Sequence, residues 1–133
     1  MARKKIWVNG CFDVLHLGHL KLLQYAKSRG QWLTVGIDSD ERVQRLKGSQ
    51  RPVNDEKSRI EMLKAIRWVD NVLVFDSDEQ LEKLVEKYSD LMIIGSEYKD
   101  QKVIGSQHSP VEFFDKIDGY SSTNIIKRME KIK

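Results

Sequence analysis

Short apolar runs alternate along the chain with longer segments in which apolar residues recur every three or four positions. The short runs are typical of strands in a sheet that is covered on both faces, and the periodic segments are typical of helices. The expected strands are residues 5–9, 32–37, 71–75, 91–94 and 111–117. The expected helices are residues 18–29, 39–46, 55–68, 77–88 and 121–131, and residues 96–110 are expected to form a loop with at most a short helix.

Regular alternation of strand and helix predicts parallel strands joined by right-handed crossovers. We therefore expect residues 1–133 to form a single α/β domain, doubly wound and Rossmann-like, with a five-stranded parallel sheet flanked by helices. In such sheets ligands bind beyond the carboxyl ends of the strands, where the strand order reverses. The segment after the first strand lies at that edge.

Composition narrows the range of partners. The 133 residues include 23 Lys and Arg against 20 Asp and Glu, a small net charge of +3 that is scattered along the chain apart from the basic residues 3–5. This balance does not indicate nucleic-acid binding, although it suits a site for an anion. No apolar run is long enough to suggest a signal peptide or a membrane span. Cys11 is the single cysteine, which is compatible with a reducing compartment, so we expect a cytoplasmic protein.

The stretch "GCFDVLHLGH" places two histidines around a glycine where the first strand gives way to a helix. The first N–H groups of a helix have no partner within it and attract anions. Gly18 has no side chain, so a phosphate can approach the backbone closely. His16 and His19 flank this glycine, and each imidazole can donate a hydrogen bond to a phosphoryl oxygen. The pattern therefore predicts a phosphate site.

Other interpretations of the same stretch remain open. A histidine near an apolar helix is commonly a packed core residue. His16, His19 and Cys11 have a spacing that suits zinc, but no fourth ligand with a fitting spacing is present. Cys11 as a nucleophile is also conceivable. Asp13 suits either a base or, better, a structural acceptor for N–H groups of the loop.

Further blocks follow "GCFDVLHLGH" in order: "RLKGSQRPVN" (45–54), "SRIEMLKAIRWVD" (58–70), "IIGSEYK" (93–99), "VIGS" (103–106) and "DGYSSTNIIKRM" (118–129). The first block resembles the H-x-G-H signature of the nucleotidyltransferase superfamily. Together, over nearly the whole chain, the blocks resemble the adenylyltransferase domain of bacterial ADP-heptose synthases. Glycerol-3-phosphate cytidylyltransferases share the same skeleton less closely.

The resemblance implies a reaction in which an acceptor phosphate attacks the α-phosphate of ATP or CTP and pyrophosphate leaves, with Mg²⁺ accompanying the triphosphate. Asp13 and Glu97 are candidates for helping to hold that Mg²⁺, and no metal ligand is certain. By resemblance, His16, His19 and Lys47 are catalytic, and Arg59 and Arg67 bind substrate phosphate. The implied nucleotide-binding residues are Gly10, Cys11, Phe12, Asp13, Gly18, Gly95, Glu97, Ser121, Ser122 and Thr123.

Two departures from the family pattern concern nucleotide recognition: the first leaves the preferred base open, and the second is conservative. Residues 95–98 are G-S-E-Y where the heptose enzymes usually have G-G-D-Y, and Ser122 stands in a turn that is usually S-T-T. The leading hypothesis is adenylyl transfer to a sugar phosphate, and the alternative is cytidylyl transfer to glycerol 3-phosphate, which forms CDP-glycerol. A third hypothesis is a sensor that binds a nucleotide without turning it over. A fragment of an aminoacyl-tRNA synthetase is disfavoured because no K-M-S-K-S-like loop is present.

The family also implies a homodimer. Trp7, Trp68, Phe113 and Phe114 are apolar residues that fit either a dimer interface or the core.

Overall fold

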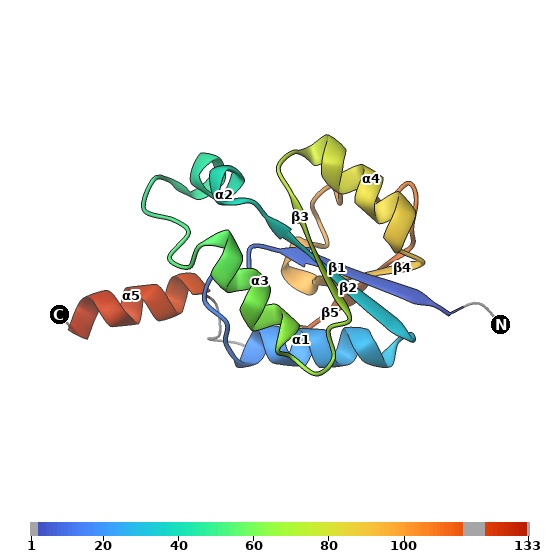
Figure 1. Cartoon of the computed structure of the whole chain (residues 1–133), viewed down its shortest axis with the longest axis horizontal. Helices are drawn as coiled ribbons and strands as arrows, with labels where there is room; N and C mark the ends of the chain where they lie inside the picture. Colours follow the sequence, from blue (N-terminus) through green and yellow to red (C-terminus); the bar gives the residue numbers. More distant parts are fainter. Residues whose placement is uncertain (1–2, 116–121, 133) are drawn as a thin grey trace.

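A five-stranded parallel sheet in the order β3-β2-β1-β4-β5 forms the centre of the computed structural model, which describes residues 3–115 and 122–132 (Figure 1). The strands are β1 Lys5–Gly10, β2 Trp32–Asp38, β3 Asn71–Phe75, β4 Leu91–Gly95 and β5 Val111–Phe114. The helices are α1 Leu17–Ser28, α2 Asp40–Lys47, α3 Glu56–Lys64, α4 Asp78–Tyr88 and α5 Ser122–Ile132, with a short 3₁₀ helix η1 at Ser96–Tyr98. The predicted α/β fold with a five-stranded parallel sheet is confirmed.

Helices cover both faces of the sheet, so that alternate residues of one strand enter two different cores. Ile6 and Val8 of β1 pack with Leu23 of α1 and Leu63 of α3 on one face. Trp7, between them, is fully buried on the other face with the residues of α4. The structure therefore places Trp7 in the core and not at a surface open to a second copy.

Helix starts follow the polar residues that precede them. Side chains of Ser39, Asp55 and Ser77 accept hydrogen bonds from the backbone N–H groups at the starts of α2, α3 and α4. The expectation that the third helix continues to residue 68 was wrong, because α3 ends at Lys64. Beyond it the chain continues in turns, although Ile66 still packs against the core. The apolar spacing thus extended one turn past the helix itself.

The strand order places β1 between β2 and β4, and this is where the order reverses. Residues that follow β1 and β4 meet at the carboxyl edge of the sheet. Helix α5 points away from the sheet in Figure 1, at the opposite end of the view from the N-terminus. Among the described residues, no helix is long and apolar enough to cross a membrane.

Candidate functional site

A cavity of about 630 Å³ opens at the carboxyl edge of the sheet. Its wall combines segments far apart in the sequence: the loop after β1, the start of α1, the end of α2, the residues after β4 and the start of α5. The predicted site residues that line it are Gly10, Cys11, Phe12, His16, Gly18, His19, Lys47, Gly95, Glu97 and Thr123. Ser121 lies outside the described residues, as does the side chain of Ser122.

The two histidines of the motif form one unit at the start of α1. His16 is the extended N-cap residue, with φ −145° and ψ 177°, and its carbonyl accepts from the N–H of Leu20 at 3.2 Å. Its own backbone N–H donates to Nδ1 of His19 at 3.3 Å. The rings stack with centroids 3.8 Å apart. Since Nδ1 of His19 accepts a hydrogen bond, neutral His19 carries its proton on Nε2, which makes Nε2 a donor.

Phe12 supports this pair from the preceding turn. Its backbone is left-handed, with φ 51°, a conformation that a bulky residue rarely adopts. The ring is only 5% exposed and lies against His19, with ring centroids 5.0 Å apart. It also covers Gly10, where an added Cβ would lie 3.2 Å from the ring. Phe12 thus positions His19, a role that no feature of the residue pattern predicts because the backbone turn arises from the surrounding contacts.

Asp13 lies beneath the cavity and does not line it. Its carboxylate is 1% exposed and accepts from the N–H groups of Val53 at 2.9 Å and Asn54 at 2.8 Å and from Nε of Arg51 at 2.7 Å. Burial by itself raises the pKa of this carboxyl, but the hydrogen bonds from Asn54, Val53 and Arg51 outweigh it and hold the pKa below its usual value. This geometry agrees with a structural acceptor, and direct nucleotide contact through this side chain does not fit.

The predicted phosphate-binding role of Arg59 does not agree with its position. The side chain is fully buried. Its guanidinium donates to the carbonyls of Cys11, Asp38 and Asn54 and to the carboxylate of Asp40, at 2.7 to 3.0 Å. These protein acceptors use the donors that a phosphate would need. Arg59 therefore joins the ends of β1 and β2 to α2 and α3, and acts on the site only by positioning the loop that contains Cys11.

Arg67 also does not reach the cavity. It is exposed in the turns that follow α3, four residues before the first residue of β3. All strands are parallel, so the residues before β3 lie at the amino edge of the sheet, opposite the edge where the cavity opens. The predicted contact between Arg67 and substrate phosphate is thus not supported within one chain.

The chemistry of Cys11 argues against nucleophilic catalysis by this residue. Burial raises the pKa of its thiol, and the nearby cations Lys47 and Arg59 only partly offset that effect. A protonated thiol is a poor nucleophile and a poor metal ligand. Within residues 3–115 and 122–132, no group of three or more His, Cys, Asp and Glu side chains is arranged to hold a metal ion. The zinc interpretation of the motif therefore has no support in the described structure.

The two predicted magnesium ligands differ in their fit. The oxygens of Asp13 are already used by Arg51 and the two loop N–H groups. Glu97 lines the cavity, and its carboxylate folds over Gly95, where an added Cβ would lie 2.5 Å from it. The described residues thus offer Glu97 as a single candidate and no protein-built magnesium cage.

Sequence reasoning missed several polar residues of the wall. Asp38, the last residue of β2, pairs with Arg42 at 2.8 Å, and Arg42 also reaches Asp78 at 2.6 Å and lies over the ring of Phe75. The position of Asp38 at the carboxyl end of a predicted strand is a signal that could have identified it. The cavity is also lined by Tyr98 at the end of η1 and by Arg51, Gln101 and Lys102. The last three come from loops whose course the residue pattern does not reveal.

Known proteins resemble this chain over nearly its whole length. The chain is 43% identical over 130 residues to the Bifunctional protein HldE of Campylobacter fetus subsp. fetus (strain 82-40), a match that covers 97% of this chain and 28% of that protein. It is 41% identical over 129 residues to the Bifunctional protein HldE of a Nitratiruptor species. That match covers 96% of this chain and 28% of that protein. The chain thus spans less than a third of the length of these curated relatives.

Among solved structures, the chain resembles the crystal structure of the lipopolysaccharide core biosynthesis protein from Thermoplasma volcanium GSS1. The TM-score is 0.72 at 24% identity, over 88% of this chain and 100% of the other, and this likeness concerns the fold alone. Residues 7–128 match the family model described as cytidylyltransferase-like. This match confirms the resemblance that the ordered motifs predicted, and the chain belongs to the cytidylyltransferase-like family.

Proposed function

We propose that this chain transfers a nucleotidyl group from a nucleoside triphosphate to a phosphorylated small-molecule acceptor, with release of pyrophosphate. The preferred reaction is adenylyl transfer from ATP to a sugar phosphate, of the kind that forms ADP-heptose. The similarity to Bifunctional protein HldE over nearly the whole chain supports this choice over the alternatives. Because the chain matches only 28% of those proteins, the proposal concerns this reaction alone.

The observation that carries the proposal is the shared cavity. The stacked His16 and His19, Lys47 at the end of α2 and Thr123 near the start of α5 all line it. Each is a donor, and they come from three elements that surround the same space. A triphosphate has negative charge along its whole length, so donors from several directions suit it better than donors from one.

In the proposed reaction an oxygen of the acceptor phosphate forms a bond to the α-phosphorus. The bond from that phosphorus to the bridging oxygen of the β-phosphate breaks, and its electron pair leaves with pyrophosphate. No covalent bond to the protein is needed, so the protein acts by positioning and by stabilising charge. The N–H groups at the start of α1 and the Nε2 proton of His19 face the developing charge, and Lys47 supplies a positive charge beside them.

Magnesium enters this proposal with the triphosphate. When bound, the ion neutralises part of the negative charge of the phosphates. Most of its ligands would be phosphate oxygens and water, since Glu97 is the remaining protein candidate among the described residues.

A pyrophosphate-release screen tests the proposal. The four nucleoside triphosphates are paired with heptose 1-phosphate, glycerol 3-phosphate and a few other phosphorylated acceptors in the presence of Mg²⁺. Release with ATP and heptose 1-phosphate is the expected result. Release of pyrophosphate only with CTP and glycerol 3-phosphate would reject adenylyl transfer and support cytidylyl transfer. Tight binding of ATP or CTP by calorimetry, without release for any pair, supports a sensor and rejects an enzyme.

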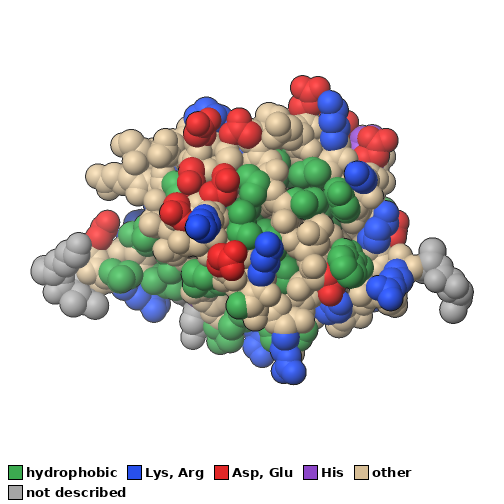
Figure 2. Space-filling view, in the orientation of Figure 1, with side chains coloured by type: hydrophobic (Ala, Val, Ile, Leu, Met, Phe, Trp, Pro, Cys, Tyr) green, Lys and Arg blue, Asp and Glu red, His purple; other side chains and the backbone are tan. Residues whose placement is uncertain are grey.

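We propose further that the protein is a cytoplasmic homodimer. The cytoplasm contains the triphosphate substrate. Met129 of α5 is 59% exposed and Phe113 of β5 is 39% exposed. Hydrophobic side chains are visible along α5 and in the centre of the face shown in Figure 2, where they suit a second copy better than water. Light scattering after size-exclusion chromatography distinguishes a dimer from a monomer of 15.5 kDa.

A further inference from the structure

Arg51 occupies an unusual position between a buried carboxylate and the cavity. Its Nε donates to Oδ2 of Asp13 at 2.7 Å, and its side chain is only 14% exposed. The same side chain lines the cavity that contains His16, His19 and Lys47. Its Nη2 is buried and has no hydrogen-bond partner among the described residues. Nε of the guanidinium therefore binds the protein, while Nη2 remains available to donate to a ligand.

A buried donor without an acceptor is rare in proteins. When such a donor belongs to a residue in a cavity wall, an acceptor atom of a bound ligand can complete its hydrogen bonding. Arginine presents its N–H groups in a planar fork that matches two oxygens of one phosphate. Because Asp13 orients the fork from behind, Arg51 loses little freedom when it binds an anion. The position thus suits a phosphate better than a neutral group.

The sheet order indicates which phosphate Arg51 meets. The triphosphate is expected at the start of α1 after β1, with its base near Gly95 after β4. Arg51 belongs to the connection between α2 and α3, which follows β2 on the other side of β1 from β4. In an in-line displacement the acceptor approaches from the side opposite the leaving pyrophosphate. The connection that carries Arg51 is therefore placed for the acceptor.

We propose that Arg51 binds the phosphate of the acceptor and orients its attacking oxygen, and that Asp13 positions Arg51 for this task. The inference rests on the proposed nucleotidyl transfer, since it assigns a residue to the second substrate of that reaction. It also gives a reason for the phosphorylated acceptor of the proposed function, since an oxygen of a phosphate monoester can accept from Nη2, which has no partner in the described part of the chain.

Steady-state kinetics of Arg51→Lys and Arg51→Gln test this assignment, with heptose 1-phosphate and ATP varied in turn. We expect the KM for the acceptor to rise roughly 10- to 100-fold, the range for loss of hydrogen bonds to a charged group, while the KM for ATP changes less than about threefold. Arg51→Lys keeps the charge beside Asp13, so it decides the question if Arg51→Gln does not fold. The control is Arg45→Gln, which changes a half-exposed arginine of α2 outside the cavity and should leave both KM values unchanged.

The outcomes separate this inference from the proposed function. If the wild-type protein releases no pyrophosphate with any acceptor, the proposed function fails and the assignment of Arg51 fails with it. If the wild type is active and folded Arg51→Lys has an unchanged acceptor KM, only the role of Arg51 is rejected. A merely structural role of Arg51 would raise both KM values together and lower Tm. A rise confined to the ATP KM would assign Arg51 to the nucleotide and overturn the inference.

Discussion

The imidazole rings of His16 and His19 lie 3.8 Å apart, centroid to centroid, with their planes inclined by 26°. This contact forms across the N-cap of α1, where the backbone N–H of His16 donates to Nδ1 of His19. The backbone bond orients the ring of His19, and the ring of Phe12 lies against it. The two residues therefore line the cavity as a stacked pair, and charge stabilisation relies on groups that are positioned in advance in this way.

Replacing either histidine should impair turnover much more than folding. We expect His16→Ala and His19→Ala each to lower kcat by at least about 10²-fold, the size expected for the loss of one positioned donor. Pyrophosphate release measures kcat, and circular dichroism verifies the fold.

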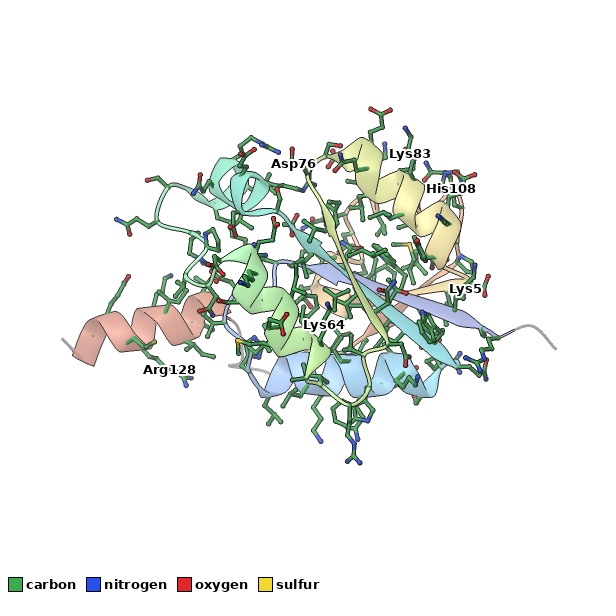
Figure 3. The ribbon with its side chains drawn as sticks, in the orientation of Figure 1. Lys5, Lys64, Asp76, Lys83, His108 and Arg128 are labelled. Carbon is green, nitrogen blue, oxygen red and sulfur yellow. The ribbon has the colours of Figure 1, made fainter. Side chains whose placement is uncertain are left out.

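The third histidine provides a matched control for this pair. His108 lies beside α4, as Figure 3 shows, and its ring pairs with Glu82 at 3.1 Å outside the cavity. His108→Ala should therefore retain wild-type turnover within about twofold. Near-wild-type rates in both His16→Ala and His19→Ala would remove the histidines from the mechanism.

Arg59 should prove to be a stability residue. Arg59→Ala leaves three carbonyls and the partly exposed carboxylate of Asp40 without their donor, and a buried acceptor left unpaired costs about 1–3 kcal/mol. Urea denaturation measures this change in the free energy of unfolding. A folded Arg59→Ala variant of wild-type stability, with a raised KM for the acceptor, would restore the predicted contact with substrate phosphate.

For Arg67, the structure and the family resemblance lead to different expectations. Arg67→Ala should change kcat and both KM values by less than about twofold, because the side chain is exposed at the amino edge of the sheet. The same kinetic assay measures it. An increase of tenfold or more in either KM would show that Arg67 reaches a site, in which case a second copy of the chain has to bring it there.

Asp13 should make stability depend on acidic pH. Its pKa in the folded protein is lower than in the unfolded chain, so its contribution is complete above the unfolded pKa of about 3.9 and is lost as the pH falls through the folded pKa. At pH 7 we expect Asp13→Asn to lower Tm by about 10 °C, from a loss of about 3 kcal/mol. The difference between wild type and variant should shrink below pH 4 in thermal melts.

An exposed aspartate serves as the control for these melts. Asp100→Asn should stay within about 1–2 °C of wild type at every pH, since surface substitutions usually change stability by less than about 0.5 kcal/mol. A Tm difference between wild type and Asp13→Asn that does not vary between pH 7 and pH 3 would contradict the role assigned to the Asp13 charge.

Local pattern predicted the order of elements well because each element depends on neighbours in the sequence. The apolar runs at β1 to β4 and the polar caps Ser39, Asp55 and Ser77 are local signals, and both appear in the structure. The same pattern overestimated α3, because Ile66 packs against the core from a turn as well as from a helix. Periodicity reports which side chains are buried and does not report where the backbone stops being helical.

The part of the site that depends on neighbouring residues was predicted, and the part that depends on distant residues was not. The contiguous motif around His16, Gly18 and His19 carries its own geometry, since a helix start follows a strand. Arg59 and Arg67 were assigned alike from residue type, yet one is buried among carbonyls and the other lies at the far edge of the sheet. Residue type alone does not tell which acceptors surround a guanidinium, because those acceptors come from distant parts of the chain.

The amino-acid sequence by itself determined the alternation of strands and helices, the parallel sheet and the position of the histidine motif at the start of α1. Those features follow from interactions between residues a few positions apart. Tertiary structure alone decided that Arg51 lines the cavity beside Asp13 while Arg59 is buried away from it. That choice depends on how the connection between α2 and α3 packs against the loop after β1, and such packing between remote segments leaves no mark in the local pattern.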